Sequence, residues 1–124
     1  MTKILIVDDS NYSRRTLRAI LESAHHEVHE AADGLAAIEK YFLHKPGLVL
    51  LDLTMKEMGG LEVLMKLREL DPAARVIAAS ADIQTATRAE VLAAGACAFL
   101  AKPFNPVEVL AVVATQLENS PSCN

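Results

Sequence analysis

The sequence predicts an α/β protein of the (βα)₅ type, in which five parallel strands form one doubly wound sheet covered by helices on both faces. Two observations carry this prediction. Short apolar, β-branched segments recur at the spacing of one strand–helix unit, and the segments between them repeat their apolar residues with the period of a helix. The expected strands are KILIV from Lys3, EVHEA from Glu27, LVLLD from Leu48, RVIAAS from Arg75 and AFLA from Ala98.

The polarity of the strands predicts their order in the sheet. KILIV and LVLLD are apolar nearly throughout, as central strands are, whereas EVHEA alternates polar and apolar residues and suits an edge. Among doubly wound sheets, this favours the order 2-1-3-4-5, in which the first and third strands lie side by side at the switch point.

The segment after the first strand has the pattern of a helix that covers one side of the sheet. Its apolar residues share one face, and its charged residues lie away from that face. The apolar set is Leu17, Ile20, Leu21 and Ala24, and the charged set is Arg14, Arg15, Arg18 and Glu22.

Later helices are bounded by residues that begin or end helices. Asp33 is a predicted N-cap, and Gly95 is a predicted C-terminal stop. Asn105, Pro106 and Glu108 predict the start of the last helix, as its N-cap, its first-turn proline and its capping-box acid.

One domain is expected to fill the 124-residue chain, of which 52% is hydrophobic and 23% charged. The folded core is expected over about residues 3–118, because no linker, repeat or low-complexity segment interrupts it. Residues 119–124, NSPSCN, are expected to be a flexible tail or the start of a linker.

Composition argues against several classes of function. No apolar run approaches the ~18 residues of a membrane span and no signal peptide is visible, so we expect a cytoplasmic protein without membrane contact. The two cysteines, Cys97 and Cys123, fit a reducing compartment and are expected to be structurally minor. A net charge of -4, no tryptophan and 4% aromatic residues argue against direct nucleic-acid binding.

Polar residues stand at the carboxyl ends of four expected strands, where the sites of open parallel sheets lie. They are Asp8 and Asp9 after the first strand, Asp52 at the third, Ser80 at the fourth, and Lys102, followed by Pro103, after the fifth. Three neighbouring carboxylates repel one another unless a cation holds them, and hard oxygen ligands suit Mg²⁺. With a hydroxyl and an ammonium group opposite, the site suits a phosphoryl group, and Asp52 is either a metal ligand or the acceptor.

Four motifs carry a resemblance to a known family. ILIVDDS, LVLLDLTM, VIAASA and AFLAKPF each end an expected strand, and in this order they resemble the receiver domain of two-component response regulators, the CheY-like family. The resemblance covers the chain from Lys3 to about Leu117 and implies the flavodoxin-like fold.

The resemblance implies a role for each of these polar residues. Asp52 would be the phosphorylated aspartate in a Mg²⁺-dependent reaction. The metal would be held by Asp8, Asp9, Asp52 and the backbone carbonyl of Thr54, and the phosphoryl oxygens by Ser80 and Lys102.

The resemblance also implies partners. The phosphodonor would be a sensor histidine kinase or a phosphotransfer protein, and the target a downstream effector protein. Such a phosphoprotein is not an enzyme in the usual sense, since only Mg²⁺-assisted self-phosphorylation and slow autodephosphorylation are expected of it.

Within the family, phosphorylation draws the hydroxyl inward and lets an aromatic residue turn, which changes the surface of the fourth helix, fifth strand and fifth helix. Ser80 and Phe99 would be these two switch residues, and Phe99 is expected to favour its inward state because it lacks a hydroxyl. Thr54 and Asp82 occupy the positions that tune the lifetime of the phosphoryl group.

The loop after the third strand departs from the family pattern. Lys56 stands where proline is common, so we expect a looser loop, and Gly59 and Gly60 are expected to add to this looseness.

Other functions stay open at this point. A Mg²⁺-dependent aspartyl-nucleophile phosphatase is one alternative, although Thr54 stands where such enzymes place a second acid. A receiver cut from a longer regulator with an output domain is another. A flavin-binding flavodoxin is disfavoured, because Asp8 and Asp9 would repel its phosphate.

Structural roles compete with some of these interpretations. Asp8 and Asp9 could simply favour a helix N-terminus, and Ser80 could be the N-cap of the fourth helix. The histidines of HHEVH, from His25, are expected to close the first helix rather than bind metal. The last expected helix, PVEVLAVVATQL, has more apolar residues than one buried face needs. Val109 and Val112 either pack normally in the core or are exposed on a partner or homodimer face.

Overall fold

Five strands and five helices alternate along the chain, in the computed structural model, which describes residues 2–55, 59–81 and 85–118. The strands are β1 (Lys3–Val7), β2 (Glu27–Ala31), β3 (Leu48–Asp52), β4 (Val76–Ser80) and β5 (Ala98–Ala101). The helices are α1 (Asn11–Ser23), α2 (Gly34–His44), α3 (Gly60–Leu70), α4 (Thr85–Ala93) and α5 (Pro106–Glu118). Each strand lies at its predicted place, except that β4 begins one residue after Arg75.

The strands form one parallel sheet in the order β2-β1-β3-β4-β5, which confirms the predicted order. The apolar strands β1 and β3 are central, and the alternating strand β2 is an edge. Val7 pairs with Leu51. The residues that follow them, Asp8 and Asp52, therefore lie side by side at the carboxyl ends of β1 and β3. The topology thus brings the two predicted acidic positions together.

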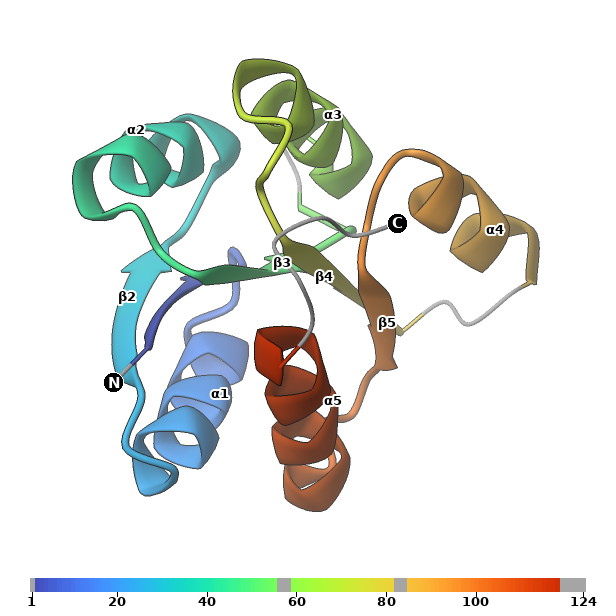
Figure 1. Ribbon diagram of the computed structural model, residues 1–124. Coiled ribbons are helices and arrows are strands. Elements are labelled where there is room, and N and C mark those ends of the chain that lie inside the picture. Colours follow the sequence, from blue (N-terminus) through green and yellow to red (C-terminus); the bar gives the residue numbers. More distant parts are fainter. Residues whose placement is uncertain (1, 56–58, 82–84, 119–124) are drawn as a thin grey trace.

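Two hydrophobic cores lie on opposite faces of the sheet, with α1 and α5 on one face and α2, α3 and α4 on the other (Figure 1). Alternate residues of the central strands point into each core, as a strand covered on both faces requires. Leu5, Val7, Val49 and Leu51 face α2 and α3, whereas Ile4, Ile6, Leu48 and Leu50 face α1 and α5.

The predicted helix ends at Asp33, Gly95 and Asn105 are confirmed, and Glu108 lies in the first turn of α5. The Asp33 carboxylate accepts a hydrogen bond from the N–H of Ala36 at 2.9 Å. Asn105 Oδ1 accepts from the N–H groups of Val107 at 2.9 Å and Glu108 at 3.2 Å. Gly95, with a φ of 112°, follows α4 in the left-handed region that favours glycine.

One expectation for a helix face needs correction, and one open choice is decided. Ala24 is not part of the buried face of α1, since it is exposed and stands as the C-cap after the helix. Val109 is fully buried and Val112 partly buried against the core of α1 and α5, so of the two alternatives left open for these valines, ordinary packing is confirmed. The exposed valine of this helix is Val107, with 78% of its surface accessible.

The histidines divide between two places. The backbone N–H groups of His25 and His26 donate to the carbonyls of Glu22 and Leu21 and close α1, as expected. His29 instead lies on β2, where its ring stacks on His44 at a centroid distance of 3.8 Å.

Of the two cysteines, Cys97 lies between α4 and β5 and is partly buried. Cys123 lies outside the described residues, as does the predicted tail.

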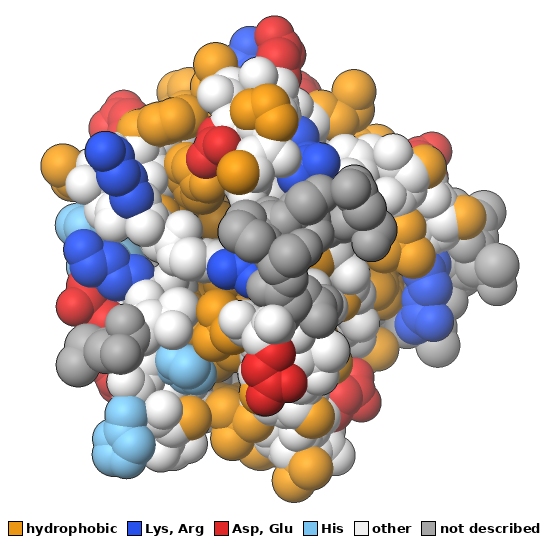
Figure 2. All heavy atoms as spheres, in the orientation of Figure 1, with side chains coloured by type: hydrophobic (Ala, Val, Ile, Leu, Met, Phe, Trp, Pro, Cys, Tyr) orange, Lys and Arg blue, Asp and Glu red, His pale blue; other side chains and the backbone are white. Residues whose placement is uncertain are grey.

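Charged groups of both signs are distributed over the surface. On the face drawn in Figure 2, basic, acidic and hydrophobic side chains alternate over short distances. Within the described part of the chain, every helix is too short or too polar to span a bilayer.

Candidate acidic phosphoryl site

Three aspartates meet at the carboxyl ends of β1 and β3. Asp8 and Asp9 follow β1, Asp52 ends β3, and one carboxylate oxygen of each lies within 4.8 Å of the others. Asp8 and Asp52 are 2% and 3% exposed, whereas Asp9 faces solvent. The arrangement therefore combines two buried carboxylates with one accessible acid.

Lys102 reaches this cluster from the end of the edge strand β5. Its Nζ atom lies 3.0 Å from Asp8 Oδ2 and 3.4 Å from Asp52 Oδ1. The residue follows β5, its backbone N–H donates to the carbonyl of Ser80, and its bond to Pro103 is cis. One ammonium group thus contacts both buried carboxylates and offsets part of their charge.

Electrostatics at Asp8 reflect this crowding. Burial raises the pKa of Asp8 above its ordinary value of 3.8, and the Asp52 carboxylate adds to the rise, while the Ser10 N–H and Lys102 oppose it. Holding Asp8 ionised therefore costs free energy, which a further cation in the cluster would reduce.

Thr54 orients the Asp52 side chain. Both its backbone N–H and its hydroxyl donate to Asp52 Oδ1, at 3.2 Å and 3.0 Å. The contact with Lys102 falls on the same oxygen. All three contacts are therefore made by Oδ1 of Asp52, and none of them involves its Oδ2.

Gly60 makes the close packing of α3 against the end of β3 possible. A Cβ atom at this position would overlap the carbonyl oxygen of Asp52 and the Cα of Leu53. The N–H of Gly60 also donates to the carbonyl of Leu53 at 3.3 Å. The expectation that Gly60 loosens the loop is therefore wrong, because its missing side chain allows a tight contact behind Asp52.

Ser80 and Phe99 lie on the neighbouring strands β4 and β5. Ser80 ends β4, is 1% exposed and stands five residues before the first residue of α4, so it is not the N-cap of that helix. Phe99 is half-buried and packs against the core of α2, α3 and α4. The Arg88 guanidinium of α4 lies 5.1 Å from the centroid of its ring.

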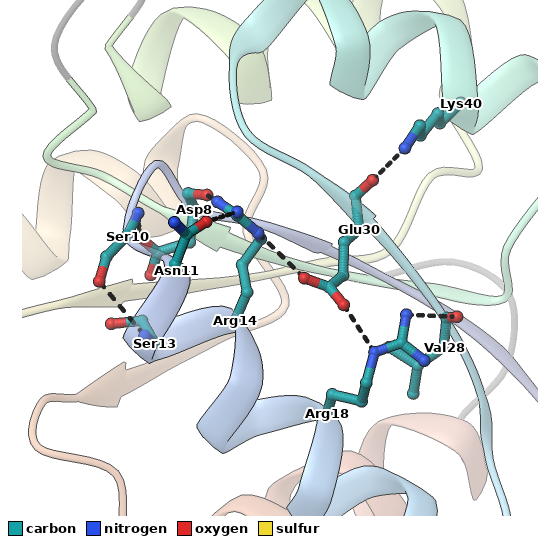
Figure 3. Close-up of polar contacts among 9 residues, drawn as sticks. All are labelled: Asp8, Ser10, Asn11, Ser13, Arg14, Arg18, Val28, Glu30 and Lys40. Carbon is teal, nitrogen blue, oxygen red and sulfur yellow. Dashed lines mark hydrogen bonds and ion pairs between the residues drawn. The ribbon is translucent and has the colours of Figure 1, made fainter.

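Two predicted positions, Lys56 and Asp82, lie outside the described residues. The sequence did not predict that Arg14 and Glu30 take part in the surroundings of the site. Arg14 was placed on the polar side of its helix, yet its Nη1 donates to the carbonyl of Asp8 at 2.5 Å and its Nε to Glu30 at 3.0 Å (Figure 3). The one sequence feature that could have indicated this contact is the negative charge of Glu30 on the predicted edge strand.

The donor set fits Mg²⁺. Three carboxylates at one point supply hard, negatively charged oxygens, and an exposed member leaves room for water and a phosphate oxygen. Softer ligands are not part of this cluster of aspartates.

Comparison with known proteins identifies the family. The model of the response regulator receiver domain matches residues 4–114. The chemotaxis protein CheY of Thermotoga maritima is 41% identical over 109 residues, which cover 87% of this chain and 91% of the relative. CheY of Listeria monocytogenes is 42% identical over 111 residues, covering 89% and 93% of the two chains.

Solved structures agree with these sequence relatives. A chain in the crystal structure of the CheX-CheY-BeF3-Mg²⁺ complex from Borrelia burgdorferi superposes with a TM-score of 0.91 at 35% identity, covering 95% of this chain and 90% of that chain. The matched family is the receiver domain, so the phosphatase alternative is set aside.

Proposed function

The chain belongs to the family of response regulator receiver domains, and on this premise we propose that Asp52 is the residue that becomes phosphorylated. A CheY-like receiver acts as the phosphoacceptor of a two-component system. The observation that carries the assignment to Asp52 is its position, because this buried carboxylate ends β3 beside Asp8 and Lys102. Thr54 holds one carboxylate oxygen, which supports attack by the other.

Asp8, Asp9, Asp52 and the backbone carbonyl of Thr54 would hold Mg²⁺. When bound, the metal would neutralise charge on the phosphoryl oxygens and on the attacking carboxylate. The raised pKa of Asp8, caused first by burial, supports a cation there, since a bound cation would favour the ionised form of this buried carboxylate.

Lys102 and Ser80 would bind the phosphoryl oxygens. Lys102 now shares its ammonium between Asp8 and Asp52, and a phosphoryl group on Asp52 would offer it new anionic oxygens within reach. Ser80 stands at the end of the adjacent strand β4, where its hydroxyl would donate to another of those oxygens.

The Ser80 and Phe99 pair would transmit phosphorylation to the surface formed by α4, β5 and α5. Movement of Ser80 toward the phosphoryl group would change the space available to Phe99, which is half-buried one strand away. This surface would bind a downstream effector protein, and a homodimer through it would be a variant of the same proposal. Thr54 and Asp82 would set how long the phosphoryl group persists.

A sensor histidine kinase or a phosphotransfer protein would donate the phosphoryl group. The relative from Borrelia burgdorferi was crystallised with CheX, BeF3 and Mg²⁺, which supports by similarity both a protein partner and a metal. The chain itself would catalyse only its own Mg²⁺-assisted phosphorylation and a slow dephosphorylation.

Phosphorylation by a small donor tests the assignment. The protein is incubated with acetyl phosphate and Mg²⁺, and intact mass is measured for the wild type, Asp52→Asn and Asp33→Asn. Asp33 is the matched control, because it is an aspartate that caps α2 and an asparagine can cap in its place. We expect one hydroxylamine-sensitive phosphoryl group on the wild type and on Asp33→Asn, and none on Asp52→Asn. The same mass gain on Asp52→Asn would refute the assignment.

A further inference from the structure

Arg14 connects three parts of the protein around the acidic turn between β1 and α1 (Figure 3). Its Nη1 donates to the carbonyl of Asp8 at 2.5 Å, its Nη2 donates to Asn11 Oδ1, and its Nε donates to Glu30 Oε1 at 3.0 Å. The side chain is only 14% exposed, and its contacts with Asp8 and Glu30 are partly buried, whereas the contact with Asn11 is exposed.

The shape of the guanidinium makes these contacts interdependent. Its nitrogens lie in one rigid plane, so a carboxylate that fixes one edge also fixes the direction in which the other nitrogens donate. Glu30 holds the Nε edge of Arg14, and the same plane then directs Nη1 to the Asp8 carbonyl. A lysine at this position would keep the charge but carry it on a single nitrogen, without the planar donor set that ties the two contacts together.

Glu30 is itself held firmly on β2. Its second carboxylate oxygen accepts from Arg18 Nε at 2.6 Å, and its backbone carbonyl accepts from Lys40 Nζ. Burial works to raise the pKa of Glu30, but the hydrogen bonds and charges of Arg18 and Arg14 outweigh it and hold the pKa below its ordinary value. The anchor for Arg14 is therefore an ionised carboxylate on a sheet strand.

Asp8 is fixed at three groups. Its N–H donates to the carbonyl of Ala31 at 3.1 Å, and its side chain accepts from the N–H of Ser10 at 2.8 Å. The third group is its carbonyl, which Arg14 holds. Because that carbonyl begins the turn that carries Asp9, its direction sets where the second acidic side chain leaves the backbone.

We propose that Arg14, anchored by Glu30, is a positioning residue that fixes the Asp8–Asp9 turn in the geometry required to bind a divalent cation. The proposal rests on the proposed function for the identity of the cation, whereas the hold on the turn belongs to the metal-free protein.

Arg18 supplies a matched control. It lies one turn further along α1 and also pairs with Glu30. Its other contacts among the described residues are with Glu22 at 2.9 Å and the carbonyl of Val28 at 3.3 Å, neither of which belongs to the acidic turn. Arg14→Gln and Arg18→Gln therefore remove the same charge and one ion pair to Glu30 each, but only the first releases Asp8.

The sign of the change in Mg²⁺ affinity separates positioning from charge. Removing a nearby positive charge alone would strengthen cation binding. Loss of positioning would weaken it, and outer partners of metal ligands typically contribute about 10-fold to 100-fold in affinity. We expect Arg14→Gln to weaken Mg²⁺ binding about tenfold by calorimetry, and Arg18→Gln to leave it within about twofold. Arg14→Lys, which keeps the charge, should not restore the affinity.

A second measurement needs no metal and no phosphorylation. In the metal-free protein, amide hydrogen exchange at Ser10 and its neighbours should accelerate about tenfold in Arg14→Gln and stay unchanged in Arg18→Gln. Equal exchange and equal Mg²⁺ affinity in the two variants, or tighter Mg²⁺ binding by Arg14→Gln, would overturn the proposal.

The two proposals fail in different ways. If the wild type bound no Mg²⁺, the proposed function would fail, while amide exchange would still decide whether Arg14 holds the turn. Should Arg14→Gln not fold, Arg14→Lys replaces it in both measurements, because it keeps the charge and an aliphatic stem but loses the planar donor set.

Discussion

Gly60 and Asp52 are in direct backbone contact, because the first residue of α3 lies against the carbonyl of the proposed phosphoacceptor. A Cβ atom on Gly60 would overlap that carbonyl oxygen. The helix behind the site and the strand that carries Asp52 are thus packed at a distance that only glycine allows.

Gly60→Ala is expected to destabilise the protein by about 1–3 kcal/mol, because either β3 or α3 must shift to admit the methyl group. Gly59→Ala is the control, since a Cβ at Gly59 would meet nothing within 4 Å, and its effect should be about 0.5 kcal/mol or less. Urea unfolding measures both, and equal losses would contradict the packing argument.

Lys102→Ala should keep the fold but uncouple phosphorylation from the surface of α4, β5 and α5. The Lys102 ammonium contacts Asp8 and Asp52, and a phosphoryl oxygen on Asp52 would attract it. An alanine has no charged group that could bind this oxygen. Amide NMR spectra before and after acetyl phosphate treatment report the response of α4 and β5. The same chemical-shift changes in Lys102→Ala as in the wild type would count against this role.

Arg88→Ala should release the ring of Phe99. The guanidinium lies 5.1 Å from the ring centroid, and a cation–π contact of this kind stabilises by about 0.5–1 kcal/mol when partly exposed. Fluorine NMR with fluorinated phenylalanine gives one resonance for each of the three Phe residues. We expect the Phe99 resonance to shift or broaden in Arg88→Ala but not in Glu90→Ala, the control on the same helix. A Phe99 signal that is identical in both variants would exclude the contact.

Tyr41 should make stability fall at high pH. Its hydroxyl donates to Asp71 Oδ2 at 2.7 Å, and burial first, then Asp71, raises the pKa of Tyr41 well above its ordinary value of 10.0. The unfolded chain therefore ionises at lower pH than the folded protein, so this stability is fully present below about pH 10 and is lost above it.

Tyr41→Phe tests this pH dependence. It should cost about 1–2 kcal/mol at neutral pH and flatten the loss of stability at alkaline pH. Tyr12, which is 76% exposed, is the other tyrosine of the chain, and Tyr12→Phe is the control. An ultraviolet titration should lose its higher-pH step only in Tyr41→Phe. Loss of that step in Tyr12→Phe would reverse the assignment.

Much of the fold and the acidic cluster could be predicted from local pattern. The period of the apolar residues determined the strands and helices, and the contrast between EVHEA and LVLLD determined which strand is an edge. Because parallel strands present their carboxyl ends at one edge, the positions of Asp8 and Asp52 were enough to predict that they meet.

Tertiary structure decided the contacts that depend on how helices dock and which rotamer a long side chain adopts. Helical periodicity places Arg14 on the polar side of α1, but only the position of β2 beside that helix directs it to Glu30 and the Asp8 carbonyl. Similarly, the local sequence does not show whether Gly60 makes the loop flexible or allows a close contact. The atoms that a side chain at Gly60 would overlap belong to Asp52 and Leu53, at the end of β3.

The sequence by itself therefore determined which residues stand at the ends of the strands, since local periodicity fixes strand positions and strand polarity favours one order. The tertiary structure decided how those residues are held. Lys102 reaches Asp8 across a separation of 94 residues in the chain, and Arg14 is aimed by a carboxylate on a neighbouring strand. Such contacts arise only when the sheet has closed and the helices have packed on it, which is why pattern alone cannot supply them.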